Sequence, residues 1–332
     1  MKSVNLVITD LFLPTEFAAE VCAGLHLPAL ERILSRGKSE TNQMVSLEDT
    51  LCGLISSGSD TTVAQVSAVY DGLGEGCWLR ADPVHLRLQR EQVVLLPEVE
   101  VSLADAMELC IDLNEHFAGE GLTFFAPHPQ RWYVKVEQSP DIITVPMSQA
   151  AGHNIHGNLP VGPESGRWHR LFNEIQMLLF AHPLNEAREA RGELPVNSVW
   201  FWGNGAVPVQ STASYVTVSS DEVLVEMLAR AIGAPFSGWQ SEWHNTEEDA
   251  QLLVWSGLRA ALQRGDLHAW REALQSFEKH YAQPLWHALR TGKIDRLQLE
   301  VAGGDRLRQF GLTRGSRWAF WHKSRPLAEY SA

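Results

Sequence analysis

The stretch that most constrains the fold is a short, almost wholly apolar run between a helical segment and a glycine turn. Residues 198–202, SVWFW, show no polar alternation, which is typical of a strand covered on both faces. The segment before it has Arg188 in its last turns and stops at Gly192, as a helix does at its C-terminus. A GNG turn follows the run. We therefore expect a buried strand whose carboxyl end, at Gly203 and Gly205, lies at the ligand-binding edge of an open α/β sheet.

Composition and charge narrow the classes of function. With 332 residues, 45% of them hydrophobic, the chain can bury one large core or two smaller ones. The formal net charge of −13 argues against nucleic-acid and anionic-membrane partners, which need a positive surface. No apolar run is long enough to span a bilayer, and the N-terminal run predicts a strand rather than a signal peptide. The four cysteines lack CxxC spacing, which is typical of reduced thiols and predicts a cytoplasmic protein.

Acidic residues stand at the ends of two other predicted strands. Residues 4–10 form an apolar run that ends on Asp10, and residues 296–305 form another that ends in glycines and Asp305. Asp10 is interpreted either as a cap of a turn or helix or as a metal or ligand contact. The alternation of such strands with amphipathic helices predicts a mixed or mostly parallel sheet with helices on both faces. These helices are predicted at residues 27–37, 221–236 and 266–289.

A small polar turn, GSDT at residues 58–61, precedes a valine-rich helix. The free N–H groups at the start of that helix gather near Ser59, so the turn suits a bound anion or an attacking serine. A plain N-cap by Ser59 or Asp60 explains the same residues. The sequence leaves both interpretations open.

The pattern of predicted secondary structure changes at Cys77, where helices give way to short strands joined by turns. The following residues predict two or three strands with turns at Asp82-Pro83 and around Arg90-Glu91, and residues 102–117 predict a helix behind them. Further strands and a loop-rich stretch continue until a helix starts at about Arg167. Within that stretch His153 and His156 have the spacing of a metal pair, but no carboxylate lies beside them, which favours a solvated or hydrogen-bonded role.

This change in predicted secondary structure indicates two domains. Residues 76–160 are expected to form an inserted α+β domain. Residues 1–75 and 161–332 are expected to form one α/β domain around it.

Four stretches, in order and over nearly the whole chain, resemble the archaeal type of 2,3-bisphosphoglycerate-independent phosphoglycerate mutase, in the alkaline phosphatase superfamily. They are VITD, PALERILSRG, GSDTTVAQVSAVYD and HPLNEAREARGELPVNSVWFWGNGAVP. The overall sequence is similar to a bacterial branch of that family, the RpfE-type regulatory proteins. The resemblance implies an alkaline-phosphatase-like sheet covered by helices on both faces, with an inserted smaller α+β domain.

The resemblance also implies a two-metal phosphotransferase site. Asp10 stands where the family has a metal-binding acid, and Ser59 stands where it has the phosphorylated nucleophile. Arg131 resembles the family's phosphate-binding arginine. The residues expected to bind a ligand are Arg131, Arg306, Asp60, Gly203 and Gly205.

The chain departs from the family's pattern at the metal ligands. The family's Asp-x-x-x-His pair is missing between Val254 and Leu267. In the segment that resembles the family's TGDHSTP turn, Asp305 remains but Arg306 replaces the histidine. An arginine cannot ligate a cation but can hold an anion. Asp10 and Asp305 are therefore interpreted as vestigial metal positions, and Ser59 as a nucleophile position without activation.

Three hypotheses of function follow. The first is a phosphoglycerate-mutase-like protein without cofactor, acting as a regulatory protein or binding phosphate or a phosphorylated small acid, with an unknown protein partner. The second is an active mutase or phosphatase that uses Ser59 and manganese or zinc. Substitute ligands for that metal would be His268, His322 or Glu300. A purely structural scaffold is the third.

Overall fold

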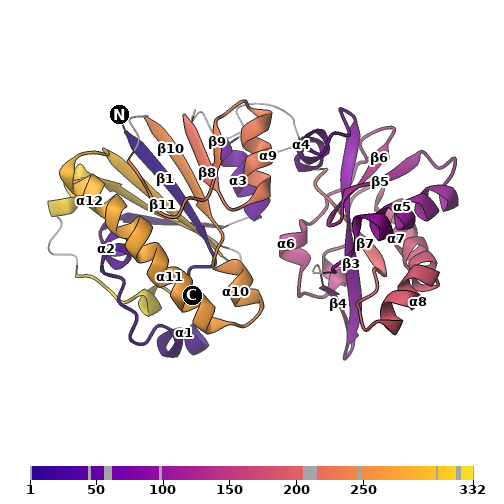
Figure 1. Ribbon diagram of the computed structural model, residues 1–332, viewed down its shortest axis with the longest axis horizontal. Coiled ribbons are helices and arrows are strands. Elements are labelled where there is room, and N and C mark those ends of the chain that lie inside the picture. The colour runs from indigo at the N-terminus through magenta and orange to yellow at the C-terminus, as the bar shows by residue number, and fades with distance from the viewer. Residues whose placement is uncertain are drawn as a thin grey trace. The chain divides into compact units, whose positions relative to one another are not determined.

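The computed structural model describes most of the chain and divides it into two compact units (Figure 1). The larger unit comprises Met1–Ser57 and Gln210–Ala332, and the smaller unit comprises Gly58–Val209. Each unit has its own sheet. Within the described residues, no helix has the length and apolar character needed to cross a membrane. The described residues are 2–43, 46–55, 62–96, 99–204, 215–245, 249–303, 306–318 and 323–331.

The larger unit is built on a seven-stranded sheet of order β2-β12-β11-β1-β10-β8-β9. Strands β11, β1, β10, β8 and β9 are parallel, whereas β12 and β2 add antiparallel pairs at one side. The predicted mostly parallel sheet is therefore confirmed. Its strands are β1 (Ser3–Thr9), β2 (Lys38–Gln43), β8 (Thr217–Ser220), β9 (Phe236–Gly238), β10 (Ala250–Trp255), β11 (Arg296–Gly303) and β12 (Arg306–Thr313).

Helices cover both faces of this sheet. Val4, Leu6 and Ile8 alternate along β1 and share one hydrophobic core with α2, α11 and α12. On the other face Val7 and Leu252 are completely buried, and α9 packs against β8 with α3 beside it (Figure 1). Burial on both faces explains why the central strands are apolar throughout. The helices are α1 (Thr15–Val21), α2 (Pro28–Arg36), α3 (Leu47–Ile55), α9 (Val223–Ala231), α10 (Arg259–Gln263), α11 (Leu267–Phe277) and α12 (Gln283–Thr291).

The long helix predicted at residues 266–289 is interrupted by a π-helical turn, Glu278–Ala282, between α11 and α12. Pro284 follows this turn and has no N–H to donate to it. The turn carries the buried carboxylate of Glu278, which accepts hydrogen bonds of 2.9 Å from the N–H groups of Ala29 and Leu30. Because these N–H groups begin α2 and have no partner within that helix, Glu278 acts as its remote cap.

The smaller unit is an α+β layer built on a sheet of order β4-β3-β6-β5, with β7 paired to β3. Helices α5 and α7 pack against strands β5 and β7 respectively. The strands are β3 (Cys77–Gln89), β4 (Gln92–Leu96), β5 (Leu122–His128), β6 (Arg131–Val136) and β7 (Ser198–Trp202). The helices are α4 (Val63–Tyr70), α5 (Leu103–His116), α6 (Met147–Ala150), α7 (Ser165–Phe180) and α8 (Pro183–Ala190).

The predicted domain boundaries are wrong. The insertion exists, but it extends from Gly58 to Val209, so that the segment after residue 161 up to β7 belongs to it. Strand β7 was expected in the same sheet as β1, yet it pairs antiparallel with β3, Ser198 opposite Val84 and Trp202 opposite Arg80. An apolar run indicates only that both faces are covered and does not identify the neighbouring strand.

A second correction concerns β3. The turn predicted at Asp82-Pro83 is absent, because β3 runs without interruption from Cys77 to Gln89. Asp82 is instead buried within the strand, where Arg80, Trp132 and Trp202 donate hydrogen bonds to its carboxylate. The turn predicted around Arg90 is confirmed, with Arg90 in a left-handed conformation (φ 56°). The four cysteines are free thiols, as their spacing predicts.

Candidate functional site

The carboxyl ends of four parallel strands of the larger unit meet at one edge of its sheet, here named the carboxyl edge. Asp10 follows β1, Glu222 lies just after β8, and Arg259 follows β10 at the start of α10. Gly303 ends β11 and pairs in the antiparallel ladder with Arg306, which begins β12. The topology therefore brings together side chains from sequence positions far apart.

Asp10 adopts an uncommon backbone conformation at this edge. Its φ of 56° lies in the left-handed region, which Asp tolerates better than most residues but which still costs about 1–2 kcal/mol. Its N–H donates to the carbonyl of Ala302 at 2.9 Å, and the indole N–H of Trp270 donates to its carbonyl at 3.3 Å. These contacts hold the Asp10 backbone in its uncommon conformation.

The partner of Asp10 in this structure is Arg259. Arg259 Nε donates to Asp10 Oδ2 at 3.0 Å, and Arg259 Nη1 lies 3.5 Å from Glu222 Oε1. All three side chains are about a quarter exposed, between 24% and 26%. One guanidinium therefore bridges two carboxylates where the resemblance implied a metal ion.

The turn that delivers Arg259 has little freedom. A Cβ at Gly257 would lie 2.4 Å from the indole nitrogen of Trp255, a distance that only glycine avoids. The same turn is bound to the end of the neighbouring strand β8, because the Ser256 N–H donates to Oδ1 of Asp221, which follows β8, at 2.8 Å.

Other expected metal ligands do not join Asp10 within the described part of the chain. No group of three or more His, Cys, Asp or Glu side chains that could hold a metal is found among these residues. Glu300 is buried within β11 and accepts a hydrogen bond from Asn5 at 3.1 Å, and His268 is exposed beside Glu272. The predicted ligands Asp305 and His322 lie outside the described residues.

Arg306 lies at the carboxyl edge, and its role as a ligand-binding residue stays a prediction. It pairs with Gly303 in the ladder, and a Cβ on Gly303 would lie 4.0 Å from the Asp10 backbone. The Arg306 side chain is exposed. Arg306 and Arg259 thus place two guanidinium groups on the same edge as Asp10.

The loop with Ser59 and Asp60 lies outside the described residues, but the helix after it is defined. Thr62 caps α4, since its hydroxyl oxygen accepts from Gln65 N–H at 3.1 Å. A Ser59 or Asp60 side chain is therefore not needed as the N-cap of this helix, which removes the plainer of the two interpretations.

Gly203 contacts the same helix end. Its carbonyl accepts from Ala64 N–H at 3.0 Å, its φ is 83°, and a Cβ here would lie 3.2 Å from Ala64 N. The glycine turn thus closes on the start of α4, directly after the loop that carries Ser59. Gly205 lies outside the described residues.

Arg131, the expected phosphate-binding arginine, is paired within the smaller unit. Its Nε and Nη2 donate to the two carboxylate oxygens of Asp71, each at 2.8 Å, and the Tyr133 hydroxyl donates to Asp71 at 2.6 Å. Burial alone would raise the pKa of Asp71, but the hydrogen bonds from Arg131 and Tyr133 bring it below its ordinary value. An anion at Arg131 must therefore share the guanidinium with Asp71 or displace that carboxylate.

A second arginine lies beneath this pair. Arg80 bonds the buried Asp82 at 2.7 Å, and its guanidinium lies over the rings of Tyr133 and Trp202, 5.2 and 5.1 Å from their centroids. Both cation–π contacts and the ion pair satisfy a charge that burial would otherwise make costly. Arg80 is therefore a structural residue.

The residues of the fourth stretch that resembles the mutases, HPLN and the segment up to Asn197, are also structural here. His182 caps α8 and lies 2.6 Å from Asp112, and Asn185 bonds the backbone of Leu179 and Val196. Asn197 bonds both backbone groups of Leu86 in β3, at 2.7 and 2.9 Å. These contacts fix the corner that sends the chain into β7.

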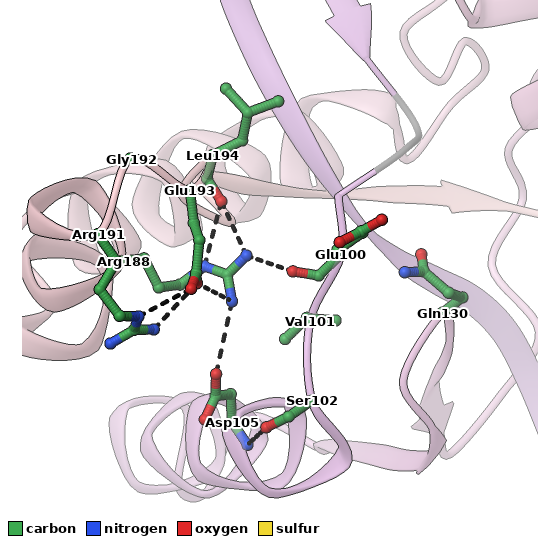
Figure 2. Close-up of a pocket in the computed structure, with 10 residues that line it drawn as sticks. All are labelled: Glu100, Val101, Ser102, Asp105, Gln130, Arg188, Arg191, Gly192, Glu193 and Leu194. Carbon is green, nitrogen blue, oxygen red and sulfur yellow. Dashed lines mark hydrogen bonds and ion pairs between the residues drawn. The ribbon is translucent and has the colours of Figure 1, made fainter.

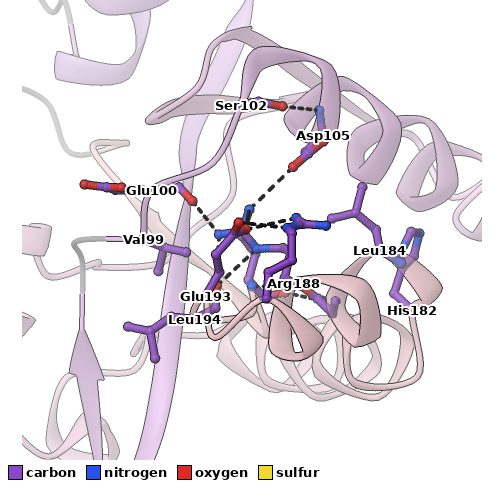
Figure 3. A network of polar contacts seen from close by, with 12 residues as sticks. Val99, Glu100, Ser102, Asp105, His182, Leu184, Arg188, Glu193 and Leu194 are labelled. Carbon is purple, nitrogen blue, oxygen red and sulfur yellow. Dashed lines mark hydrogen bonds and ion pairs between the residues drawn. The ribbon is translucent and has the colours of Figure 1, made fainter.

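Arg188 is the centre of this corner (Figures 2 and 3). Only 2% exposed, it donates to the carbonyls of Leu194 and Glu100 and approaches the carboxylates of Asp105 and Glu193 at 3.4 Å. A cavity of about 840 Å³ opens beside it, between α5 and the turn after α8. The charged groups that line the cavity are paired largely with one another, so they support the corner rather than a ligand.

The structure therefore places the predicted residues in two groups. Asp10 and Arg306 share the carboxyl edge of the larger unit, whereas Arg131 and Gly203 lie in the smaller unit. Convergence of all of them in one cleft stays a prediction. Sequence reasoning missed Arg259, Glu222 and Asp71. A signal for Arg259 existed, because it is the first of two arginines, with Arg264, in the segment that lacks the Asp-x-x-x-His pair.

Comparison with known proteins identifies relatives by sequence. No family model matches the chain. It is 38% identical over 64 residues, 19% of its length, to 16% of a Geobacter sulfurreducens protein named probable 2,3-bisphosphoglycerate-independent phosphoglycerate mutase. It is 26% identical over 201 residues, 54% of its length, to 48% of the 2,3-bisphosphoglycerate-independent phosphoglycerate mutase of Methanosarcina barkeri. The chain therefore spans about half the length of these relatives or less.

A solved structure shares the fold. The PH0037 protein of Pyrococcus horikoshii superposes with a TM-score of 0.56 at 12% identity, over 99% of this chain and 92% of that protein. The chain is thus a two-unit α/β protein with a helix-covered sheet. By sequence it is homologous to the 2,3-bisphosphoglycerate-independent phosphoglycerate mutases. The resemblance of the chain to these enzymes had predicted an alkaline-phosphatase-like sheet.

Proposed function

We propose that this phosphoglycerate-mutase-like chain is a non-catalytic regulatory or anionic-ligand-binding protein of the RpfE type. The observation that supports the proposal is the ion pair between Asp10 and Arg259 at 3.0 Å. A first-strand acid that is to bind a metal ion needs its oxygens free for the ion, and Arg259 uses one of them. The guanidinium also repels a cation that approaches the same carboxylate.

The chemistry of a serine nucleophile makes this difference important. Ser59 would attack as an alkoxide only where a cation or a base lowers the cost of losing its proton. Arginine is a donor that stays charged and cannot serve as the base. We therefore propose that Ser59 occupies the nucleophile position without activation.

Arginine side chains favour an anion as the ligand. Arg259 is engaged by Asp10 and Glu222, so Arg306 is proposed to provide the contact at the carboxyl edge for phosphate or a phosphorylated small acid. Arg131 is proposed to contribute once Asp71 releases part of its guanidinium. The protein partner implied by a regulatory role is unidentified, and the free thiols favour a cytoplasmic location.

The alternative is an active metal-dependent phosphoglycerate mutase or phosphatase with Ser59 as nucleophile. Two observations favour it: the sequence matches to mutases, and the N-cap role of Thr62, which means that the cap of α4 is not the role of Ser59. In that case manganese or zinc would bind at the edge with ligands from outside the described residues.

Melting curves and a coupled mutase assay separate the two functions. We expect manganese, zinc and cobalt to leave the melting temperature unchanged and to give no turnover, and 3-phosphoglycerate or phosphate to raise it. A tight metal site at a hundred times its dissociation constant would add about 2.7 kcal/mol of stability. Metal-dependent turnover that disappears in Ser59→Ala would reject the proposal. Arg306→His alone should not restore turnover, because the Asp-x-x-x-His pair would still be missing.

A further inference from the structure

The carboxyl edge does not fit the metal pair that homology to the mutases suggests. Arg259 lies within ion-pair distance of both Asp10 and Glu222, at 3.0 and 3.5 Å. Its guanidinium is positively charged and can only donate hydrogen bonds. A divalent ion bound by the same two carboxylates would lie against that charge.

We infer that Arg259 is a built-in cation, which holds the carboxylates of Asp10 and Glu222 together in place of a divalent metal ion. The inference rests on the proposed function, because it explains how the edge stays stable without metal. Its consequence is specific: removal of the guanidinium should turn the edge into a site that binds a divalent cation.

The backbone on both sides of the bridge is fixed, so the carboxylates should stay in place without Arg259. Asp10 is held by Ala302 and Trp270, and Glu222 is held through its N–H, which donates to Ser220 Oγ at 2.9 Å. Two carboxylates left together without a cation repel each other at a cost that a bound ion would remove. Carboxylate oxygens suit manganese and magnesium.

Solvent access makes such binding possible. The side chains of Asp10, Glu222 and Arg259 are 24–26% exposed, so an ion can enter from solvent and keep several of its waters. With two protein carboxylates, the site would be weak and should saturate only at millimolar ion.

The experiment compares Arg259→Ala with wild type in melting curves and isothermal titration with manganese chloride at constant ionic strength. Arg264→Ala is the matched control, because Arg264 is an exposed arginine at the end of the same short helix. Arg259→Lys keeps the charge and should behave like wild type. The double variant Asp10→Asn/Arg259→Ala removes one carboxylate.

We expect Arg259→Ala to melt below wild type without metal and to gain about 2 °C or more in millimolar manganese. Wild type, Arg264→Ala, Arg259→Lys and the double variant should gain nothing. The inference is overturned if Arg259→Ala binds no manganese or if wild type binds it equally well. If Arg259→Ala does not fold, Arg259→Gln, which keeps the length and loses the charge, is measured instead and must bind manganese. Mutase turnover by wild type would reject the proposed function. The manganese titrations of the Arg259 variants would still decide whether Arg259 replaces a metal ion.

Discussion

The two units hold their buried charges in different ways. In the smaller unit, a buried and a partly buried arginine pair with acids: Arg80 with Asp82 at 2.7 Å and Arg131 with Asp71 at 2.8 Å. In the larger unit, the buried acids Glu278 and Glu300, each 3% exposed, accept hydrogen bonds from amide groups instead. The larger unit also has one arginine pair, that of Arg259 with Asp10 at the carboxyl edge, but both side chains are about a quarter exposed.

This difference teaches which charges belong to the architecture and which remain available for a ligand. A buried arginine whose donors are all used cannot leave its partners without unfolding its surroundings. A partly exposed bridge such as Arg259 can exchange partners with solvent or an anion at smaller cost. The comparison also predicts opposite responses to pH for Asp71 and Glu300, because the hydrogen bonds from Arg131 and Tyr133 lower the pKa of Asp71 whereas burial raises the pKa of Glu300.

The largest effect is expected for Arg188→Ala in the smaller unit. The change leaves the carbonyls of Leu194 and Glu100 without a donor and opens a hole in a site that is 2% exposed. Because one partner is lost from a buried network, we expect the free energy of unfolding to fall by about 3–5 kcal/mol. Urea unfolding measures this change. Arg188→Lys keeps the charge but loses the planar fork, and should recover only part of that loss.

Arg191→Ala is the control for that change. Arg191 lies one turn further on, is exposed, and pairs with Glu193 at the surface. No measurable loss is expected, because exposed ion pairs contribute little. Equal losses for Arg188→Ala and Arg191→Ala would contradict the view that Arg188 organises the corner.

The second prediction tests the paired acids of the smaller unit through Asp71→Asn. Asp71 has a lowered pKa in the folded state, so its stabilising contribution is present above the ordinary aspartate value of about 3.9. That contribution is lost as pH falls through the folded pKa. We expect Asp71→Asn to cost about 2–3 kcal/mol at pH 7 and progressively less below pH 4, as followed by urea unfolding at each pH.

Glu137→Gln serves as the control for this pH dependence, because Glu137 is an exposed acid directly after β6. Its stability difference from wild type should stay near zero across the same range. A loss in Asp71→Asn that does not change with pH would show that packing, not charge, is what Asp71 provides.

Helix α4 offers a third test, because Asp71 ends it and Gly203 contacts its start. Gly203→Ala should cost about 2 kcal/mol, from a left-handed backbone and from a Cβ 3.2 Å from Ala64 N. Gly192→Ala is matched in backbone, with φ 77°, but its Cβ would meet nothing within 4 Å, so about 1 kcal/mol is expected. Equal losses in chemical unfolding would remove the close approach as a cause.

Much of the local structure was predictable from the sequence. Strands β1 and β7 and helix α2 could be predicted because their apolar or amphipathic patterns are complete within a few neighbouring residues. The partner of β7 was not predictable. It depends on Asn197 meeting Leu86 and on Trp202 meeting Asp82, contacts between residues more than a hundred positions apart.

For the candidate site, the sequence predicted where residues lie in the sheet but not which residues they contact. Asp10 and Arg306 lie at the carboxyl edge because strand ends locate them. Their electrostatic partners could not be predicted, since the bridge from Asp10 to Arg259 spans 249 positions and the pair of Arg131 with Asp71 spans 60. Single-sequence patterns carry no information on such pairs.

The smallest effect, and the sharpest test of the comparison, is expected for Glu300→Gln in the larger unit. Burial raises the pKa of Glu300, and the hydrogen bonds from Asn5 and Gln309 only partly offset this. A raised folded pKa means that stability is fully present below the unfolded value of about 4.3 and is lost as pH rises through the folded value. Glutamine can still accept from Asn5 without carrying the charge. We expect Glu300→Gln to match wild type near pH 4 and to exceed it by up to about 1 kcal/mol at pH 8, opposite in direction to Asp71→Asn.

Glu40→Gln, at an exposed acid of strand β2 in the same sheet, should show no such pH dependence. Urea unfolding at both pH values decides the matter. Stability lost by Glu300→Gln at pH 8 would mean that the charged carboxylate has a cationic partner in the folded protein. That result would revive Glu300 as a metal ligand, because an acid that binds a cation is stabilised by its charge, whereas an acid held by amide groups is not.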